Sequence, residues 1–170
     1  MNTEIIPFSS KYRCYLKSLN EAWLKKYFYV EASDVIQLGN PEKEIIEKGG
    51  FIYFAKVGMK VVGVSALMLL EDGVYELSKM AVDENYQGQG IGKKLAIVCI
   101  EKANEIFARK VILYSNRKLK RAIRLYEHLG FEEVDLVDQH YDRADIKMEL
   151  DLHSERHKAL SFMTTHYWYR

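Results

Sequence analysis

The segment Gln87-Gly88-Gln89-Gly90-Ile91-Gly92 joins a strand-like stretch, residues 74–82, to a helix-like stretch that runs to about residue 107. A strand that turns into a helix through glycines points several backbone N–H groups and the positive end of the helix at one place. Glycines also let a ligand approach the backbone without a Cβ atom in between. The segment therefore predicts an anion-binding loop. The alternative is a glycine-rich helix start that holds no ligand.

Two common phosphate-binding loops do not match this segment. A Walker loop needs four residues between its first glycine and Gly-Lys-Ser/Thr, whereas Gly88 and Gly92 enclose three, and Lys93 is followed by Lys94. A dinucleotide-binding fingerprint needs Gly-x-Gly-x-x-Gly, and here the third glycine comes one residue early. That fingerprint also belongs to a parallel sheet, but the segments before this loop predict an antiparallel meander.

Working outward, hydrophobic periodicity predicts a single α/β (α+β) domain with a mixed, mostly antiparallel sheet. The expected strands are residues 3–7, 51–57, 61–70, 74–82, 111–114, 131–137 and 145–150. The expected helices start at Ser9 or Ser10, at the Asn40-Pro41 pair, at about Gly90 and at Leu119. The strand–helix–strand passage from Val74 to Tyr114 implies one parallel strand pair. We expect a domain of residues 1–150 and an extension, residues 151–170, of unknown role.

Two sequence blocks resemble the GNAT superfamily of N-acetyltransferases. Gln87-x-x-Gly90-x-Gly92, after Met80-Ala81-Val82, is similar to the acyl-CoA pyrophosphate loop of that family. Asn116, Ala122 and Tyr126, the last within 125–131, are similar to the segment around its catalytic tyrosine. The resemblance covers residues 3–150 and implies a sheet of about six to seven strands with helices on both faces.

The resemblance implies acetyl-CoA as the acyl donor. The backbone of Met80 and Val82 would bind the pantetheine arm, and the N–H of Met80 could polarise the thioester carbonyl. The N–H groups from Gly88 to Lys93 would hold the pyrophosphate, Gln87 would shape the turn, and Asn116 would meet the pantetheine amides. The whole set implied for the donor is Met80, Ala81, Val82, Gln87, Gly88, Gln89, Gly90, Ile91, Gly92, Lys93, Asn116, Ala122 and Tyr126.

Two side chains are candidates for proton transfer. By the resemblance, Tyr126 donates a proton to the departing CoA thiolate, a step open to a phenol that keeps its proton at neutral pH. The alternative for Tyr126 is a core residue of an apolar stripe. Glu76 stands six residues before Val82, where histone-type members carry a general base. Burial on an inner strand would raise the pKa of Glu76. The alternatives are a surface carboxylate, a ligand for the substrate ammonium, or water as the base.

Charged and aromatic residues indicate where the ends of the ligands lie. The cations Arg117, Lys118, Lys120, Arg121 and Arg124 form either a solvated helix face or a contact for the adenosine 3′-phosphate, and Lys93 and Lys94 could assist at the pyrophosphate. Acidic groups suit a cationic amine, although surface placement is the alternative. They are Glu21, Glu31, Asp34, Asp138 and Asp142, among Trp23, Tyr27, Tyr29 and Tyr141.

Composition excludes several other classes of protein. The chain is 48% hydrophobic and 29% charged with a formal charge of +1, which is typical of a globular domain and not of a nucleic-acid coat or a protein of acidic membranes. The longest uncharged apolar run, residues 61–70, is far short of the roughly 20 residues of a spanning helix. The N-terminus lacks a signal-like segment, so a cytoplasmic location is expected.

The cysteine and histidine residues give no strong indication of a disulfide or a metal site. Cys14 and Cys99 are expected to be buried and reduced, and no metal cofactor is expected. His153 and His157, four apart, form either a metal pair or, more simply, a solvent-facing pair. The aromatic tail (Phe162, Tyr167, Trp168, Tyr169) suggests packing on the domain or a homodimer contact.

The expected function is acetyl transfer from acetyl-CoA to a primary amine, preferably of a small molecule, by direct transfer in a ternary complex. The alternatives are a peptide or protein amine as acceptor, or a non-catalytic acyl-CoA sensing module on the same fold.

Overall fold

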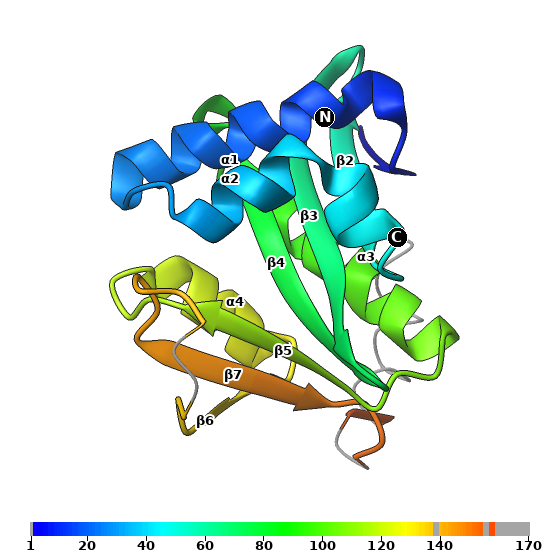
Figure 1. The fold of residues 1–170 in the computed structure, drawn as a ribbon, viewed down its shortest axis with the longest axis vertical. Coiled ribbons are helices and arrows are strands. Elements are labelled where there is room, and N and C mark those ends of the chain that lie inside the picture. The colour runs from blue at the N-terminus through cyan, green and yellow to red at the C-terminus, as the bar shows by residue number, and fades with distance from the viewer. Residues whose placement is uncertain (1, 138–139, 155–156, 159–170) are drawn as a thin grey trace.

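A computed structural model describes residues 2–137, 140–154, 157 and 158, and shows a seven-stranded mixed sheet (Figure 1). The strand order across the sheet is β1-β2-β3-β4-β5-β7-β6. The strands are β1 (Thr3–Pro7), β2 (Phe51–Val57), β3 (Lys60–Glu71), β4 (Val74–Val82), β5 (Lys110–Ser115), β6 (Glu132–Val134) and β7 (Ile146–Asp151). All neighbouring pairs are antiparallel except β4 and β5, so the predicted fold class and the predicted parallel pair are both confirmed.

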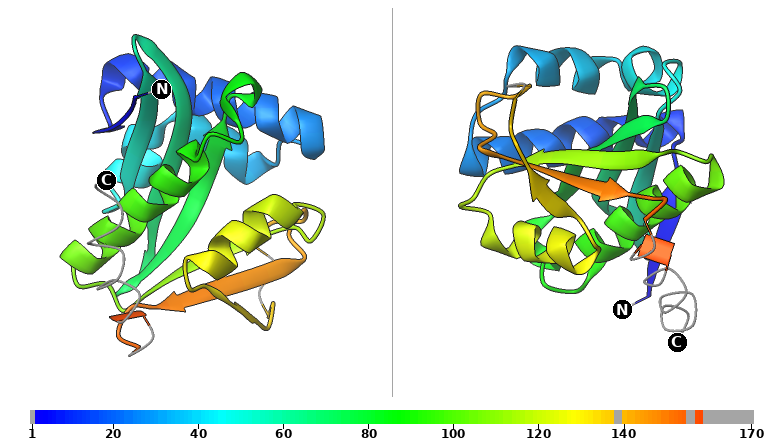
Figure 2. Two further views of the ribbon diagram at one scale, coloured as in Figure 1. Left: turned by 180° about the vertical axis from the view of Figure 1, so that it is seen from behind. Right: turned by 90° about the horizontal axis from the view of Figure 1, so that it is seen from below.

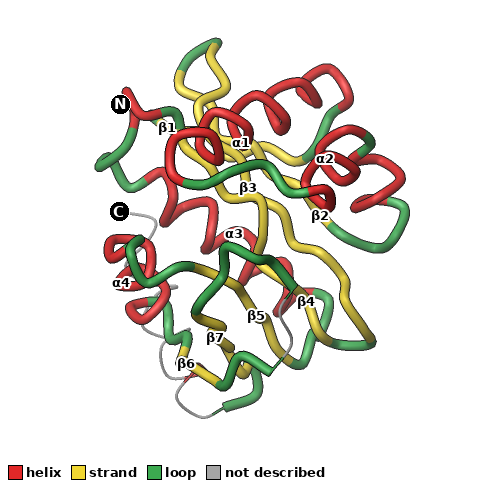
Figure 3. Tube along the Cα trace, turned by 60° about the vertical axis from the view of Figure 1, so that its left-hand side comes forward, coloured by secondary structure: helices red, strands yellow, loops and turns green. Residues whose placement is uncertain are grey.

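Helices cover both faces of this sheet. They are α1 (Arg13–Tyr27), α2 (Ala32–Gly39), α3 (Ile91–Glu105) and α4 (Lys120–His128), with short turns of helix at Ser10–Tyr12, Glu42–Ile46 and Glu84–Tyr86. Seen from behind, α3 and α4 lie in front of the strands while α1 lies beyond them (Figure 2). The tube in Figure 3 shows α2 beside α1. The core is accordingly in two parts, one under α3 and one under α1.

The central feature of the sheet is the separation of β4 from β5. Their parallel ladder joins Val74–Glu76 to Lys110–Ile112 and ends there. Beyond it the strands diverge, and the gap opens toward the left of Figure 1, between β4 with α1 above and β5 with α4 below. The residues past the ladder, Leu77–Val82 of β4 and 114–116 at the end of β5, line a cleft along this gap.

Close packing of α3 against β3 depends on one glycine. A Cβ atom at Gly63 of β3 would stand 3.0 Å from the Leu95 side chain and 3.2 Å from that of Ile91, both on α3. The glycine lets the start of α3 sit directly on the strand, which fixes the position of the preceding loop.

Several predicted elements differ from the structure. The helix α2 was not expected, and the helix predicted after Asn40 is a single wide turn, Glu42–Ile46. The helix expected from Ser9 or Ser10 begins as a 3₁₀ turn at Ser10, and Ser9 makes no side-chain cap bond. The strand expected at 131–137 is limited to Glu132–Val134.

Two expectations about single side chains are wrong. Cys14 is exposed on α1, although Cys99 is buried as expected. His157 is not solvent-facing, since it is 7% exposed and hydrogen-bonds Asn104 of α3, while His153 lies in a turn. In the described part of the chain no group of three or more metal-binding side chains occurs, and no helix is long and apolar enough to cross a membrane. Asp138 and the aromatic tail lie outside the described residues.

Candidate functional site

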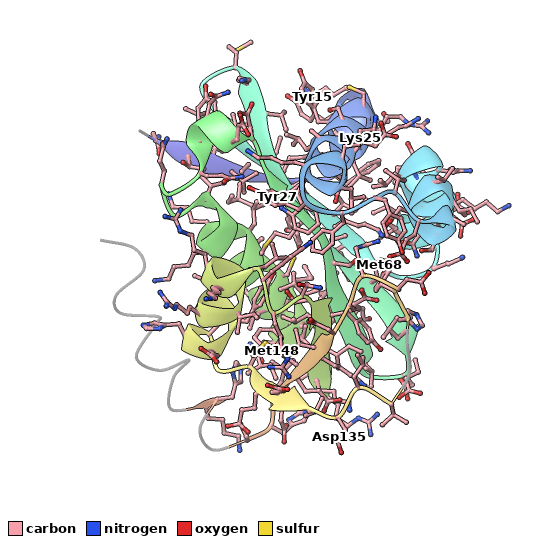
Figure 4. All side chains as sticks on the ribbon, turned by 90° about the vertical axis from the view of Figure 1, so that its left-hand side faces the viewer. Tyr15, Lys25, Tyr27, Met68, Asp135 and Met148 are labelled. Atoms are coloured by element: carbon pink, nitrogen blue, oxygen red, sulfur yellow. The ribbon has the colours of Figure 1, made fainter. Side chains whose placement is uncertain are left out.

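A cleft of about 640 Å³ follows the gap between β4 and β5. Its walls come from the end of α1, from β4, from the glycine loop and the start of α3, from β5 and α4, and from the loop before β7. Figure 4 looks at the molecule from the side on which the gap opens, with Tyr27 labelled at the end of α1 and Met68 labelled on β3, where it pairs with Glu76 in the ladder. Segments distant in sequence thus share one binding space.

The glycine loop has the geometry of an anion cradle. Gly88 and Gly90 both have φ = +77°, a conformation that residues with a Cβ atom rarely adopt, and a Cβ atom on either would meet no protein atom within 4 Å. Gly90 is the N-cap of α3, so the first N–H groups of that helix face the same space. The Gln87 amide donates a hydrogen bond of 3.1 Å to the carbonyl of Val82 and so ties the loop to the end of β4.

The cations predicted near the donor site differ in their contacts. Lys93, Lys120 and Arg121 line the cleft close to the loop and the start of α4. Arg117 instead forms an ion pair with Glu133. Lys118 crosses the cleft, where its ammonium group donates a 2.8 Å hydrogen bond to the carbonyl of Tyr27 and lies 4.0 Å from the ring centroid of Phe28.

Tyr126 reaches the cleft from α4. The residue is 9% exposed, its ring packs edge-on against Phe131 at 5.9 Å between centroids, and it lines the cleft. Burial raises the pKa of its phenol, so the group keeps its proton at neutral pH. Tyr126 is thus both a core residue and a cleft residue, and a protonated donor stands at this wall.

Glu76 reaches the cleft from the opposite face of the sheet, because its neighbour Leu77 packs in the α3-side core and successive strand residues alternate. It is only 2% exposed, which excludes a surface carboxylate. The Tyr141 hydroxyl donates a 2.9 Å hydrogen bond to Glu76 Oε1, whereas the buried Oε2 has no partner among the described residues. Burial raises the pKa of Glu76, and the Tyr141 hydrogen bond only partly opposes that effect.

A buried cluster of charged side chains lines the part of the cleft that contains Glu76. Asp34 of α2 accepts a 2.8 Å hydrogen bond from Lys79 and two, of 2.7 and 3.2 Å, from Arg143. Arg143 also lies 2.9 Å from Glu31. Burial alone would raise the pKa of Asp34, but Lys79 and Arg143 together outweigh it and hold that pKa below its usual range. These four side chains form two balanced pairs that join α2, β4 and the loop before β7.

Lys79 enters this cluster through an irregularity of β4. Its φ is +52°, and the β3–β4 register shifts between Val64 and Ala66, opposite this residue. Such a bulge turns the side chain and interrupts pairing at a chosen point. The buried Asn20 amide of α1 donates a 3.2 Å hydrogen bond to the carbonyl of Lys79 and fixes the irregular backbone.

The structure brings together most of the residues that the sequence singled out. Met80, Ala81, Val82, Gln87, Gly88, Gly90, Ile91, Gly92, Lys93, Asn116, Ala122 and Tyr126 all line the cleft, together with Glu76. Gln89 lies in the same loop but is not a lining residue. The Asn116 amide is already engaged, since its Nδ2 donates a 2.8 Å hydrogen bond to the carbonyl of Arg143. A pantetheine contact by this side chain stays a prediction.

Sequence reasoning missed Lys79 and Arg143. A lysine between Ser78 and Met80, inside a strand otherwise rich in apolar residues, was the signal that could have drawn attention to β4. For Arg143 no local signal exists, because its partner Asp34 lies 109 positions away.

A mixed sheet that parts beside a glycine loop, with a tyrosine and a buried carboxylate lining the gap, is the arrangement that the resemblance to N-acetyltransferases implied. A model of the acetyltransferase (GNAT) family matches residues 12–131. The chain therefore belongs to the GNAT acetyltransferase family.

Individual relatives agree with this assignment. The uncharacterized N-acetyltransferase YjgM of Escherichia coli is 41% identical over 73 residues, which are 43% of this chain and 44% of that protein. An N-acetylaspartate synthetase of Xenopus tropicalis is 38% identical over 95 residues, 55% of this chain and 35% of that enzyme. The matched part is thus less than half of the length of these two relatives.

Among solved structures, a GNAT-family acetyltransferase of Staphylococcus aureus Mu50 shares the fold. Its TM-score is 0.80 at 24% identity, over 89% of this chain and 99% of that one.

Proposed function

We propose that this protein transfers the acetyl group of acetyl-CoA to a primary amine of a small molecule, by direct attack within a ternary complex. The observation that carries the proposal is the placement of Tyr126 and Glu76, which reach one cleft from opposite faces of the sheet, a cleft that the glycine loop also lines. A proton donor and a proton acceptor on either side of one space are what an acyl transfer to an amine requires.

The donor half of the cleft suits acetyl-CoA. The N–H groups of the loop from Gly88 to Lys93 would hold the pyrophosphate, and the glycines leave room for it. Lys120 and Arg121, on the neighbouring wall, supply positive charge for the 3′-phosphate. The backbone of Met80 and Val82 borders the gap and can bond the amides of the pantetheine arm.

The reaction balances with two protein groups. Glu76 takes a proton from the acceptor ammonium, which leaves a neutral amine. The amine nitrogen bonds to the thioester carbonyl carbon, and the N–H of Met80 stabilises the negative charge that develops on the carbonyl oxygen. The carbon–sulfur bond breaks and Tyr126 gives its phenolic proton to the thiolate. The nitrogen, which became positively charged on attack, loses its extra proton to the tyrosinate, which restores the phenol, and Glu76 releases to solvent the proton that it took from the ammonium. The amide and free CoA are released.

Two connections over the cleft favour a small acceptor. Lys118 bridges to the carbonyl of Tyr27 on one side, and the backbone N–H groups of Asp142 and Arg143 donate hydrogen bonds of 3.3 and 3.2 Å to Glu31 on the other. A protein lysine approaching on a folded surface would need a wide groove here. The bridged cleft suits a free small molecule better.

The main rival is a non-catalytic acyl-CoA sensor. Such a module needs the donor half of the cleft but has no use for a buried carboxylate with an unpartnered oxygen. Burying a carboxylate costs free energy unless the group is fully paired, so Glu76 favours an enzyme.

Thiol release from acetyl-CoA tests the proposal, with a panel of amines and with Tyr126→Phe beside the native chain. We expect release that depends on the amine and falls at least about tenfold in kcat in the variant, with the KM for acetyl-CoA nearly unchanged. Tight acetyl-CoA binding without turnover on any amine would contradict the proposal in favour of the sensor. Equal rates in both proteins would remove Tyr126 from its role.

A further inference from the structure

Lys118 is a cation of the cleft wall that is not matched by an acidic side chain. It stands in the loop between β5 and α4. Its ammonium group donates a 2.8 Å hydrogen bond to the carbonyl of Tyr27 and lies 4.0 Å from the ring centroid of Phe28. Both partners are uncharged, and no carboxylate in the part of the chain that the structure describes forms an ion pair with it. An ammonium group has three hydrogens, so donors remain for an anion.

The loop that carries Lys118 is held in place by hydrogen bonds. The Lys118 N–H donates one of 3.1 Å to Asn116 Oδ1, and the Arg117 N–H donates one of 2.8 Å to Asp145 Oδ1. The Asn116 amide donates in turn to the carbonyl of Arg143. A ligand that binds Lys118 therefore does not have to order this backbone, which lowers the entropic cost of binding.

The ammonium group of Lys118 lies on the same face of the sheet as the Glu76 side chain. Glu76 is paired with Met68 across the β3–β4 ladder, and Met68 belongs to the core under α1. Tyr27, the partner of Lys118, is the last residue of α1. The glycine loop leads instead into α3 on the other face (Figure 2). Lys118 is thus placed beside the route by which an acceptor would reach Glu76.

The buried cluster of Glu31, Asp34, Lys79 and Arg143 adds no free charge to this part of the cleft. Asp34 pairs with Lys79 and with Arg143, and Arg143 also pairs with Glu31. Glu76, in contrast, keeps a buried oxygen, Oε2, that has no partner among the described residues. A ligand on this face therefore meets one negative group and one positive group that are both open to it.

From this arrangement we infer that the acceptor is an amino acid, whose carboxylate binds the ammonium group of Lys118 while its amino group approaches Oε2 of Glu76. The inference rests on the proposed function and names its substrate class. A hydrogen bond between an ammonium group and a carboxylate is stronger than one between neutral groups, so it can anchor the acceptor and orient its amine. A polyamine would instead bring a second positive charge into a cleft where Lys118 already stands.

A purely structural role for Lys118 is the alternative. The carbonyl groups of the last turn of a helix lack partners within the helix, and a cation at that end is stabilising. Lys118 could therefore serve only to hold the end of α1. In that case its loss would affect every acceptor alike. The inference predicts an effect that depends on the carboxylate of the acceptor.

The experiment measures kcat/KM at saturating acetyl-CoA, with the full chain, for free amino acids with apolar, polar, acidic and basic side chains. Each is compared with the amine that remains when its carboxyl groups are removed, for example leucine with isoamylamine. For the amino acid with the highest kcat/KM, we expect at least a tenfold advantage over its amine.

The variant Lys118→Met keeps an unbranched side chain and loses the charge. We expect kcat/KM for the best amino acid to fall at least about tenfold, mainly through KM, while the value for the matching amine changes less than twofold. The KM for acetyl-CoA should stay within twofold. Lys25→Met is the matched control and should behave as the native chain, because Lys25 lies on α1, pairs with Glu21 and does not line the cleft.

Each outcome has a separate meaning. Amines used as well as, or better than, their amino acids would overturn the inference and leave the acetyltransferase proposal standing. An equal fall for both members of a pair in Lys118→Met would assign Lys118 to the structure of α1, and a raised KM for acetyl-CoA would assign it to the donor; either result overturns its role as the carboxylate anchor. Absence of turnover on all pairs and on the wider amine panel, with acetyl-CoA bound, would overturn the proposed function and this inference with it.

Discussion

The hydroxyl group of Tyr141 donates a 2.9 Å hydrogen bond to Oε1 of Glu76, across 65 positions of the sequence. Tyr141 is thus a hydrogen-bond donor to a buried carboxylate. It favours the charged form of Glu76, and therefore it lowers a pKa that burial raises. The balance of the two effects sets the pH at which Glu76 can act as a base.

Tyr141→Phe should move the acid limb of the pH profile of kcat/KM to higher pH. A hydrogen bond to a carboxylate contributes about 1.5–3 kcal/mol, so the expected shift is about one pH unit or more. Lys79 and His140, which also lower this pKa, and Ser78 are retained in the variant. Tyr53→Phe is the control, since Tyr53 is a buried tyrosine of β2 that does not line the cleft. An unmoved acid limb in Tyr141→Phe would show that Tyr141 does not position the base.

Glu76→Gln should lose activity and gain stability. Removing a general base lowers kcat by about 10²-fold or more. Because the pKa of Glu76 is raised in the fold, its charged form is disfavoured there, and the stability cost appears as pH rises above the ordinary glutamate value. The melting temperature of the variant should therefore exceed that of the native chain at pH 8, and the two should converge in acid.

Thermal melts between pH 4 and pH 8 check this prediction, with Glu47→Gln, an exposed position, as the control. A variant that is less stable than the native chain at pH 8 would mean that Lys79 stabilises the ionised Glu76 more than burial destabilises it.

Asp34→Asn should destabilise the fold strongly. The change leaves Lys79 and Arg143 buried beside a neutral amide, and breaking a buried ion pair in this way costs about 3–5 kcal/mol. The pKa of Asp34 is lowered, so its contribution is present above the ordinary aspartate value and is lost as pH falls through the lowered one. The difference between native and variant in chemical denaturation should thus shrink in strong acid. Glu21→Gln, on the outer face of α1, should change stability little.

Gly90→Ala should weaken CoA binding, and the backbone strain that the alanine introduces should not by itself explain the loss. Gly90 has φ = +77° with open space where a Cβ atom would stand, and Gly58 in the β2–β3 turn has φ = +58° with the same open space. Both changes impose a similar backbone cost of about 1 kcal/mol. Calorimetry with CoA should show a fall in affinity of at least tenfold for Gly90→Ala and none for Gly58→Ala. Equal affinities would contradict a pyrophosphate site at this loop.

Local signals were enough for much of this molecule. The strands Phe51–Val57 and Val74–Val82 have the bounds that the apolar pattern predicted, and so has the edge strand Thr3–Pro7, although its alternation is weak. The glycine loop could be predicted because a backbone with positive φ angles, or one that a ligand approaches closely, requires glycine, and glycines are visible in the sequence. Tyr126 and Glu76 both line the cleft. They were singled out by the resemblance to the N-acetyltransferase family, and their roles in proton transfer stay predictions.

The features that escaped prediction depend on contacts between distant segments. The helix α2 is held by Asp34, whose partners Lys79 and Arg143 come from other parts of the chain. An acidic residue in a short polar stretch looks like a surface charge until those partners are known. Cys14 shows the reverse error, since it follows an apolar pattern on a helix face that turns out to be exposed.

The short ladder between β4 and β5 affects how readily this part of the sheet opens locally. Three residues of each strand join β1–β4 to the β5–β7–β6 half, so the seam is weak compared with the ladders on either side. The amides that border the gap lack a neighbouring strand there, and a bound pantetheine arm would stand in for it. Residues 77–82 stay paired with β3 on their other edge, so hydrogen exchange in deuterated water should be fast in the free protein only at those amides of the stretch that point toward β5, and slow there once CoA is bound.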